Sequence, residues 1–214
     1  MNSELSFRII FLTFWIALTA IMLYYTGKTR KPGVKFSIRE RLFYANLKEA
    51  SRREGKLNLV LRAALSPFWV AAVALYLIYP DWMTHYTIPL PIWLRWTGVS
   101  VSIISLPLLA WAQHTLGKEY ARILRVRKEQ TLVTSGPYRW IRHPMYTAGS
   151  VFMIGLAVES ANWLVAPPTL AGIVLLCARA WREENMLIER FGDKYRAYMK
   201  RTGRFLPRSK GSNK

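Results

Sequence analysis

The sequence is poor in cysteine, histidine and acidic residues, and each shortage excludes a class of protein. One cysteine, Cys177, is too few for a disulfide framework or a cysteine-rich metal site. The chain has three histidines, His85, His114 and His143. They lack the spacing of metal ligands, so no metal site is predicted. Aspartate and glutamate number 12 against 31 lysines and arginines, which gives a formal net charge of +19.

A strongly basic chain is a candidate nucleic-acid binder, but the distribution of its charges argues against that function. A nucleic-acid binder spreads its basic residues over a soluble domain with its own core. Here hydrophobic residues make up 52% of the chain and charged residues 20%, and the basic residues fall in blocks between long apolar runs. That pattern is typical of the cytoplasmic loops of membrane proteins. We therefore expect a lipid bilayer as partner and no nucleic acid.

Three apolar runs are long enough to cross a bilayer as helices: residues 7–25, 59–79 and 92–113. The first lacks a basic leading segment and a small-residue cleavage site, so it is interpreted as a retained helix. Two shorter runs, 146–158 and 163–178, predict a hairpin that only just spans, with Pro167-Pro168 bending its second helix. The sequence thus predicts an all-α polytopic membrane bundle of about five transmembrane helices with a cytoplasmic C-terminal helical cap.

The distribution of basic residues orients these helices through the positive-inside rule. Residues 26–56, 117–142 and the tail after 179 are basic, whereas 80–91 and 159–163 contain no lysine or arginine. We expect the N-terminus outside and the C-terminus in the cytoplasm. One membrane domain is expected over 1–214, with N-terminal transmembrane helices in 1–116 and a cofactor-binding catalytic half in 117–214. Residues 36–57 predict either an interfacial amphipathic helix or a solvated basic loop.

Two cytoplasmic segments carry the residue types that a ligand site needs. Residues 130–146 lead into the fourth apolar run, and residues 179–187 leave the fifth. If these two runs form a hairpin, their cytoplasmic ends are neighbours. That arrangement would bring His143 and Tyr146 close to Arg179 and Glu183.

The first segment has the composition of a ligand platform. Pro144 suits the first turn of a helix, where its missing N–H is no loss, and the free N–H groups of that turn favour an anionic group. The turn at Gly136-Pro137 would expose the backbone of Leu132 and Val133 for hydrogen bonding. Flat faces for a heterocycle or a cation come from Tyr138, Trp140, His143 and Tyr146.

The second segment supplies charge. Arg179 and Glu183 are four residues apart and share one helix face. They form either part of a site or a plain i,i+4 ion pair, worth about 0.2–0.5 kcal/mol. Charges at the end of a membrane helix favour the functional interpretation.

At these residues the chain resembles the membrane methyltransferases of the isoprenylcysteine carboxyl methyltransferase family, which is also similar to phospholipid methyltransferases. The resemblance covers the C-terminal half. It is carried, in this order, by Leu132-Val-Thr-Ser-Gly-Pro-Tyr138, Arg142-His-Pro-Met-Tyr146, Glu183-Glu184, Phe191-Gly-Asp-Lys-Tyr195-Arg-Ala-Tyr198 and Arg201-Thr-Gly203.

The resemblance implies S-adenosyl-L-methionine as cofactor, held in a cytoplasmic pocket over the membrane. It implies that Tyr138 lies beside the adenosine, that Glu183 completes the pocket and that Arg179 faces the methyl acceptor. The residues expected along the adenosine are Gln130, Thr131, Leu132 and Val133. Those expected at the ribose and the amino-acid part are His143, Pro144, Met145 and Tyr146.

We expect an amphipathic or lipid-like acceptor that enters from the lipid side. A carboxylate acceptor, oriented by Arg179, needs no general base because it is deprotonated at neutral pH. An amine acceptor would need a base, and Glu184 is then the candidate. The alternatives are an NADPH-dependent membrane sterol or enone reductase, and a non-catalytic membrane protein that binds anionic lipid. The Glu183-Glu184 pair and the motif at 142–146 favour the methyltransferase.

Overall fold

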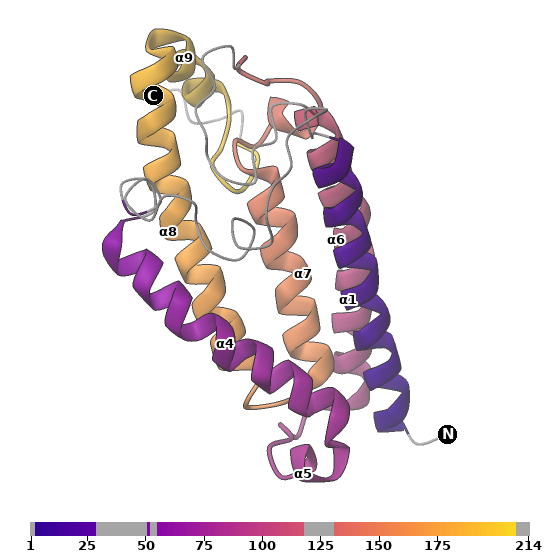
Figure 1. The fold of residues 1–214 in the computed structure, drawn as a ribbon. Helices are drawn as coiled ribbons and strands as arrows, with labels where there is room; N and C mark the ends of the chain where they lie inside the picture. The colour runs from indigo at the N-terminus through magenta and orange to yellow at the C-terminus, as the bar shows by residue number, and fades with distance from the viewer. Residues whose placement is uncertain (1–2, 29–50, 52–54, 118–130, 209–214) are drawn as a thin grey trace.

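The computed structural model describes residues 3–28, 51, 55–117 and 131–208, and every regular element within those residues is helical (Figure 1). Of residues 36–57 only 51 and 55–57 are described, and Gln130 lies outside the described residues. The predicted all-α class is confirmed. The elements are α1 (Ser3–Lys28), α4 (Lys56–Ile78), α5 (Pro80–Thr84), α6 (Ile92–Leu116), the 3₁₀ helix η2 (Gly136–Arg139), α7 (Pro144–Ser160), α8 (Ala166–Phe191) and α9 (Asp193–Arg201).

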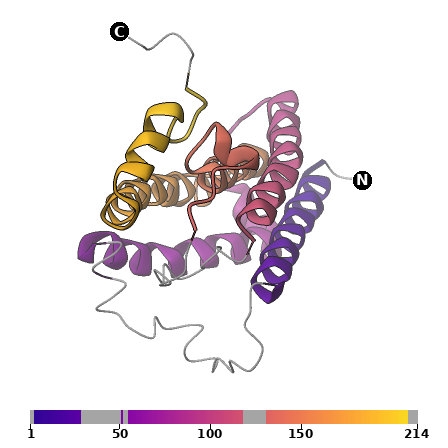
Figure 2. The same ribbon diagram turned by 90° about the horizontal axis from the view of Figure 1, so that it is seen from above.

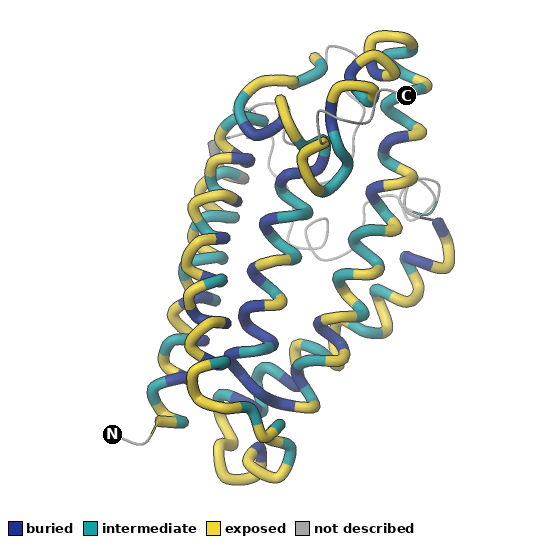
Figure 3. Tube along the Cα trace, turned by 180° about the vertical axis from the view of Figure 1, so that it is seen from behind, coloured by how far each residue is buried: buried dark blue, intermediate teal, exposed yellow. Residues whose placement is uncertain are grey.

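Among the described residues, three helices are long and apolar enough to cross a membrane: Ser3–Tyr25 of α1, Lys56–Ile78 and Ile92–Leu116. Large apolar side chains on them point outward; Ile16 of α1 and Ile104 of α6 are each 62% exposed. Exposed positions run along the outer side of the bundle (Figure 3). Extensive apolar surface of this kind is expected where helices contact lipid rather than water. The predicted polytopic membrane bundle is confirmed.

The helices α7 and α8 form the predicted hairpin and lie alongside the apolar helices (Figure 1). At 17 residues, α7 is near the lower limit for a crossing. At 26 residues, α8 continues well beyond 178, where the predicted span ended. Gly192 then separates it from α9. The count of five crossings stays a prediction.

The two prolines of the hairpin lie in the first turn of α8. The prediction that Pro167-Pro168 bends this helix was wrong, because α8 begins at Ala166 and not at residue 163. In a first turn the missing N–H of proline has no helical partner to lose, so the helix continues without a break.

The turn of the hairpin is held against α5 and the segment that follows it. The N–H of Ile88 donates to the carbonyl of Ala161 at 2.6 Å. The side-chain amide of Asn162, which is 1% exposed, donates to the carbonyl of Met83 at 3.1 Å. These contacts hold the turn of the hairpin in place, and the turn sets the distance between α7 and α8 at this end of the bundle.

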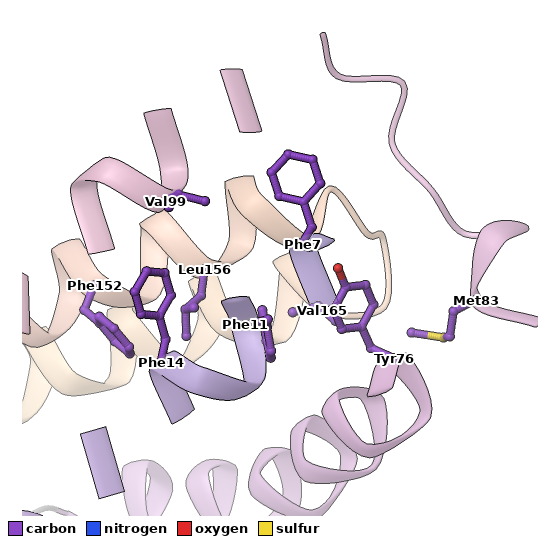
Figure 4. Close-up of a cluster of buried hydrophobic side chains, with 9 residues drawn as sticks. All are labelled: Phe7, Phe11, Phe14, Tyr76, Met83, Val99, Phe152, Leu156 and Val165. Atoms are coloured by element: carbon purple, nitrogen blue, oxygen red, sulfur yellow. The ribbon is translucent and has the colours of Figure 1, made fainter. Parts of the chain in front are cut away.

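Small residues bring α6 and α7 close together. A Cβ atom on Gly155 would lie 2.7 Å from the carbonyl oxygen of Gly98 and would also meet the side chain of Ser102. Small side chains allow helices in membranes to approach closely. A buried apolar cluster extends this contact to α1 and α4 (Figure 4): Phe7, Phe11, Phe14, Tyr76, Met83, Val99, Phe152, Leu156 and Val165.

The helix α4 runs obliquely beside α8 (Figures 1 and 2). The indole N–H of Trp69 donates to the hydroxyl of Thr169 at 2.9 Å. About three turns nearer the start of α4, the amide of Asn58 donates to the carbonyl of Leu175 at 3.1 Å. These bonds place the first half of α4 next to the part of α8 that leads to Arg179 and Glu183.

Candidate active site

The first residues of α7 are positioned by the chain segment that follows α9. The N–H of Arg142 donates to the carbonyl of Gly203 at 2.8 Å, and the N–H of His143 donates to the carbonyl of Arg204 at 3.1 Å. Pro144 then opens α7 in the first helical turn, as the sequence predicted. The tail therefore helps to fix the direction in which α7 begins.

Glu184 connects α7, α8 and this tail. It is 2% exposed and lies beyond the apolar part of α8. Its Oε1 accepts a hydrogen bond from Nε of Arg142 at 2.7 Å and lies 3.4 Å from Nε2 of His143, and its Oε2 accepts from Arg204 at 2.5 Å. Burial alone raises the pKa of Glu184, but the interactions with His143, Arg204 and Arg142 outweigh it and hold that pKa well below its usual range. Glu184 is therefore ionised at neutral pH.

These contacts disfavour the predicted role of Glu184 as a general base for an amine acceptor. A general base works best with a pKa near the operating pH and needs an oxygen that can reach the proton it removes. Both oxygens of Glu184 instead accept hydrogen bonds from arginine, and its pKa is lowered. The geometry is that of a residue that positions its neighbours.

Tyr146 and Glu183 join the two segments that the sequence predicted to converge. The hydroxyl of Tyr146 donates to Oε2 of Glu183 at 2.7 Å. The ring of Tyr146 also stacks on that of His143, with ring centroids 5.3 Å apart and an angle of 7° between the planes. Aromatic faces beside a carboxylate form a suitable environment for a cation.

Two half-buried arginines lie beside this contact. Arg179 precedes Glu183 by one turn of α8, as predicted. Arg62 of α4 lies within electrostatic reach of both Arg179 and Tyr146, although the sequence-based prediction did not include it. A signal was present, because Arg62 is a single basic residue inside the apolar run 59–79 and charges within membrane helices often mark functional sites.

The residues predicted along an adenosine precede α7. Thr131 is exposed and Leu132 and Val133 are half-buried, in an irregular segment before η2. Tyr138 is 7% exposed, and its carbonyl accepts a hydrogen bond from the hydroxyl of Tyr198 at 2.5 Å. These contacts tie η2 to α9, and the roles of the four residues stay predictions.

The remaining predicted residues, Pro144 and Met145, are buried and half-buried. With Ala148 and Val151, Pro144 lines an apolar groove along α6 and α7. In the part of the chain that the structure describes, no three histidine, cysteine or acidic side chains gather in a way that could hold a metal ion.

The fold and the site together define a polytopic helical membrane protein with a polar, charged site at one end of its bundle. Residues 98–189 match the isoprenylcysteine carboxyl methyltransferase (ICMT) family. The resemblance predicted from the sequence is therefore confirmed. The matching range begins in α6, includes all of α7 and ends in α8 after Glu183 and Glu184.

Individual relatives agree with this match. The chain is 36% identical over 152 residues to a protein-S-isoprenylcysteine O-methyltransferase of Xenopus laevis, covering 70% of this chain and 50% of that protein. It is 30% identical over 117 residues to the cobalt-zinc-cadmium resistance protein CzcN of Cupriavidus metallidurans, covering 53% of this chain and 54% of that protein. The chain spans about half the length of the curated relatives it matches.

A solved structure shows the same fold. The eukaryotic intramembrane Ras methyltransferase ICMT matches this chain with a TM-score of 0.53 and 22% sequence identity, covering 92% of this chain and 67% of that one. The likeness extends to the N-terminal helices, which the family match does not include.

Proposed function

We propose that this chain is an integral membrane methyltransferase that transfers a methyl group from S-adenosyl-L-methionine to the carboxylate of an amphipathic or lipid-like acceptor of the isoprenylcysteine type. The observation that carries the proposal is the 2.7 Å hydrogen bond between Tyr146 and Glu183, because it joins the two segments that hold the family's motifs. Relatives named as protein-S-isoprenylcysteine O-methyltransferases support the reaction class.

The residues around this bond fit the methyl donor. S-adenosyl-L-methionine, when bound, supplies an electrophilic methyl group on a positively charged sulfur. The stacked rings of His143 and Tyr146 and the carboxylate of Glu183 suit its positive groups, and the first turn of α7 suits its carboxylate. Glu184 holds His143 in place through the contacts described above. The proposed donor-binding residues are Gln130, Thr131, Leu132, Val133, Tyr138, His143, Pro144, Met145, Tyr146 and Glu183.

Arg179 is proposed to orient the carboxylate of the acceptor. With the methyl donor held by the residues named above, one carboxylate oxygen would attack its methyl carbon, and the carbon–sulfur bond would break with its electron pair remaining on sulfur. No proton is transferred, since the carboxylate is already ionised at neutral pH. The reaction therefore needs alignment and exclusion of water more than acid–base catalysis. The arginine contacts of Glu184 agree with such a base-free reaction.

The site is proposed to face the cytoplasm, with the N-terminus outside. Two observations support this orientation. The N-terminus and α5 lie at one end of the bundle and α9 at the other (Figure 1). The helices α1 and α6, which precede the basic segments 26–56 and 117–142, also end toward the side of the bundle where α9 lies, as the positive-inside rule expects of helices that lead into cytoplasmic loops (Figure 1). An acceptor with an apolar tail can then approach the site from the bilayer.

The test is radiolabel transfer by the purified protein in detergent, from the labelled methyl donor to an S-prenylcysteine analogue, a lipid extract and small amines in parallel. We expect label in the S-prenylcysteine analogue as a methyl ester that mild base releases. Label only in water-soluble amines would contradict a lipid-like carboxylate acceptor. Stabilisation of the protein by NADPH but not by the methyl donor would instead support the reductase, and stabilisation by neither would support a non-catalytic lipid binder.

A further inference from the structure

We propose that Arg62 of α4 binds the carboxylate of the acceptor together with Arg179 of α8, so that two guanidinium groups recognise one carboxylate. The proposal rests on the proposed methyltransferase function and adds a substrate-binding residue from a third helix. It also gives the N-terminal half of the chain a direct part in the site.

The position of Arg62 on α4 turns it toward α8. Asn58 and Trp69 of α4 hydrogen-bond to α8, at 3.1 Å and 2.9 Å. Arg62 lies four residues after Asn58 and seven before Trp69, which is the spacing of a single helix face. Its guanidinium group is within electrostatic reach of Arg179 and of Tyr146.

The positive-inside rule does not account for Arg62, because this residue lies inside the membrane helix and not at its end. Apart from Lys56, the first residue of α4, Arg62 is the one charged residue in that helix. It follows Lys56 by six residues, which is about 9 Å along the helix axis. A charged side chain inside an apolar helix is costly and is found mainly where it faces a polar interior or a ligand. Arg62 is half-buried, and the residues within its electrostatic reach, Arg179 and Tyr146, belong to the candidate site.

The charges near Arg62 favour an anionic ligand. Arg62, Arg179 and Glu183 together carry one net positive charge, which a carboxylate would neutralise. Arginine presents a planar fork of donors that matches a carboxylate in geometry. Glu183 meanwhile accepts a hydrogen bond from Tyr146, on the side of the site proposed for the donor. The two arginines come from α4 and α8, the pair of helices between which an acceptor from the bilayer would lie.

This arrangement predicts a larger effect on KM than on kcat. The acceptor carboxylate is negatively charged before transfer and becomes a neutral ester, while the positively charged sulfur becomes a neutral thioether. The attraction to Arg62 is therefore strongest in the ground state and decreases toward the product. Such an attraction improves substrate binding without accelerating the chemical step. Because the attraction is weaker for the neutral ester, the product can leave more easily.

The experiment compares Arg62→Ala and Arg62→Gln with wild type, and uses Lys56→Ala as the matched control. Lys56→Ala removes a positive charge from the same helix at an exposed position. We expect the Arg62 variants to raise KM for an S-prenylcysteine analogue by about tenfold, with kcat changed less than about threefold. Lys56→Ala should change neither. Calorimetry with S-adenosylhomocysteine should give a Kd within about twofold of wild type for all variants.

A second readout separates recognition of the carboxylate from a structural effect. Wild type should bind the carboxylate form of the S-prenylcysteine analogue more tightly than its carboxamide, measured as competitive inhibition. The Arg62 variants should lose most of that preference. If both variants fail to fold, Arg62→Lys is measured instead, and loss of the planar fork should still raise KM by about threefold.

Three results would overturn the proposal. The first is that folded Arg62→Ala and Arg62→Gln keep the wild-type KM and the wild-type preference for the carboxylate. Where only Arg62→Lys folds, the corresponding result is an unchanged KM in that variant. Another is a weaker Kd for S-adenosylhomocysteine with an unchanged KM for the acceptor, which would assign Arg62 to the carboxylate of the donor. The third is an equal effect of Lys56→Ala. In each case wild type would still transfer methyl groups, whereas a wild-type protein without transfer would refute the proposed function itself.

Discussion

Replacing Glu184 with glutamine tests how the site end of the bundle is held together. The carboxylate is 2% exposed and pairs with Arg142 at 2.7 Å and Arg204 at 2.5 Å, whose side chains are 9% and 21% exposed. Glutamine has a similar shape but leaves both guanidinium groups without their counterion. Removing one partner from a buried ion pair costs about 3–5 kcal/mol. Because Arg204 is partly exposed, we expect the free energy of unfolding to fall by about 3 kcal/mol. For a chain of this size the melting temperature should fall by about 6–12 °C.

Thermal unfolding followed by tryptophan fluorescence in a single detergent measures this loss. Glu189→Gln is the matched control, because Glu189 lies on the same helix and is exposed; its change should leave the melting temperature within about 1 °C. The pKa of Glu184 in the folded chain lies below its ordinary value of 4.5. The advantage of wild type over Glu184→Gln should therefore be complete above pH 4.5 and shrink below it, since the unfolded chain then binds a proton that the folded chain does not. Equal stability of the two proteins at pH 7 would refute the reasoning.

Three further predictions concern the site and the packing of α7. Tyr146→Phe removes the hydrogen bond to Glu183 and should weaken the binding of S-adenosylhomocysteine about tenfold by calorimetry, and an unchanged Kd would argue against this pair as part of the donor site. Arg179→Ala should abolish turnover in the radiolabel assay, because Arg179 is proposed to orient the attacking oxygen and not only to bind the carboxylate; that Kd should change by less than about threefold, and retained turnover would contradict this role. Gly155→Ala should destabilise the protein by about 1–3 kcal/mol, because the new Cβ would lie 2.7 Å from a carbonyl oxygen of α6. Gly149→Ala, whose Cβ meets nothing within 4 Å, should leave the melting temperature unchanged or raise it, and equal effects of the two changes would contradict the packing described.

The features that the sequence predicted correctly depend on local patterns. Long apolar runs predicted the membrane helices, and the short polar interval at 159–163 predicted the hairpin. A hairpin brings its two open ends together whatever the details of its packing, so the approach of Tyr146 to Glu183 followed from chain order alone. Pro144 at the start of α7 followed from the geometry of proline.

The features that were missed depend on contacts between distant segments. The arginine partners of Glu184 lie 42 residues before it and 20 residues after it, and no local pattern indicates that they meet. Arg62 reaches the site because α4 runs obliquely beside α8, and its crossing angle is set by packing rather than by the α4 sequence. The error at Pro167-Pro168 came from the start of α8, since a difference of three residues moves these prolines from the helix interior to the first turn.

The neighbouring residues Glu183 and Glu184 show why two adjacent carboxylates in one motif need not share a role. Successive residues of an α-helix point about 100° apart, so two acids in sequence face different neighbours. Glu183 faces α7 and accepts the hydroxyl of Tyr146, whereas Glu184 faces Arg142 and the tail residue Arg204. One carboxylate can therefore contact the ligand while the other holds in place the segments that form the pocket. It follows that Glu183→Gln should weaken donor binding while the melting temperature stays nearly normal. Glu184→Gln should mainly lower the melting temperature. Measuring both quantities for both variants shows how completely the two adjacent carboxylates differ in role.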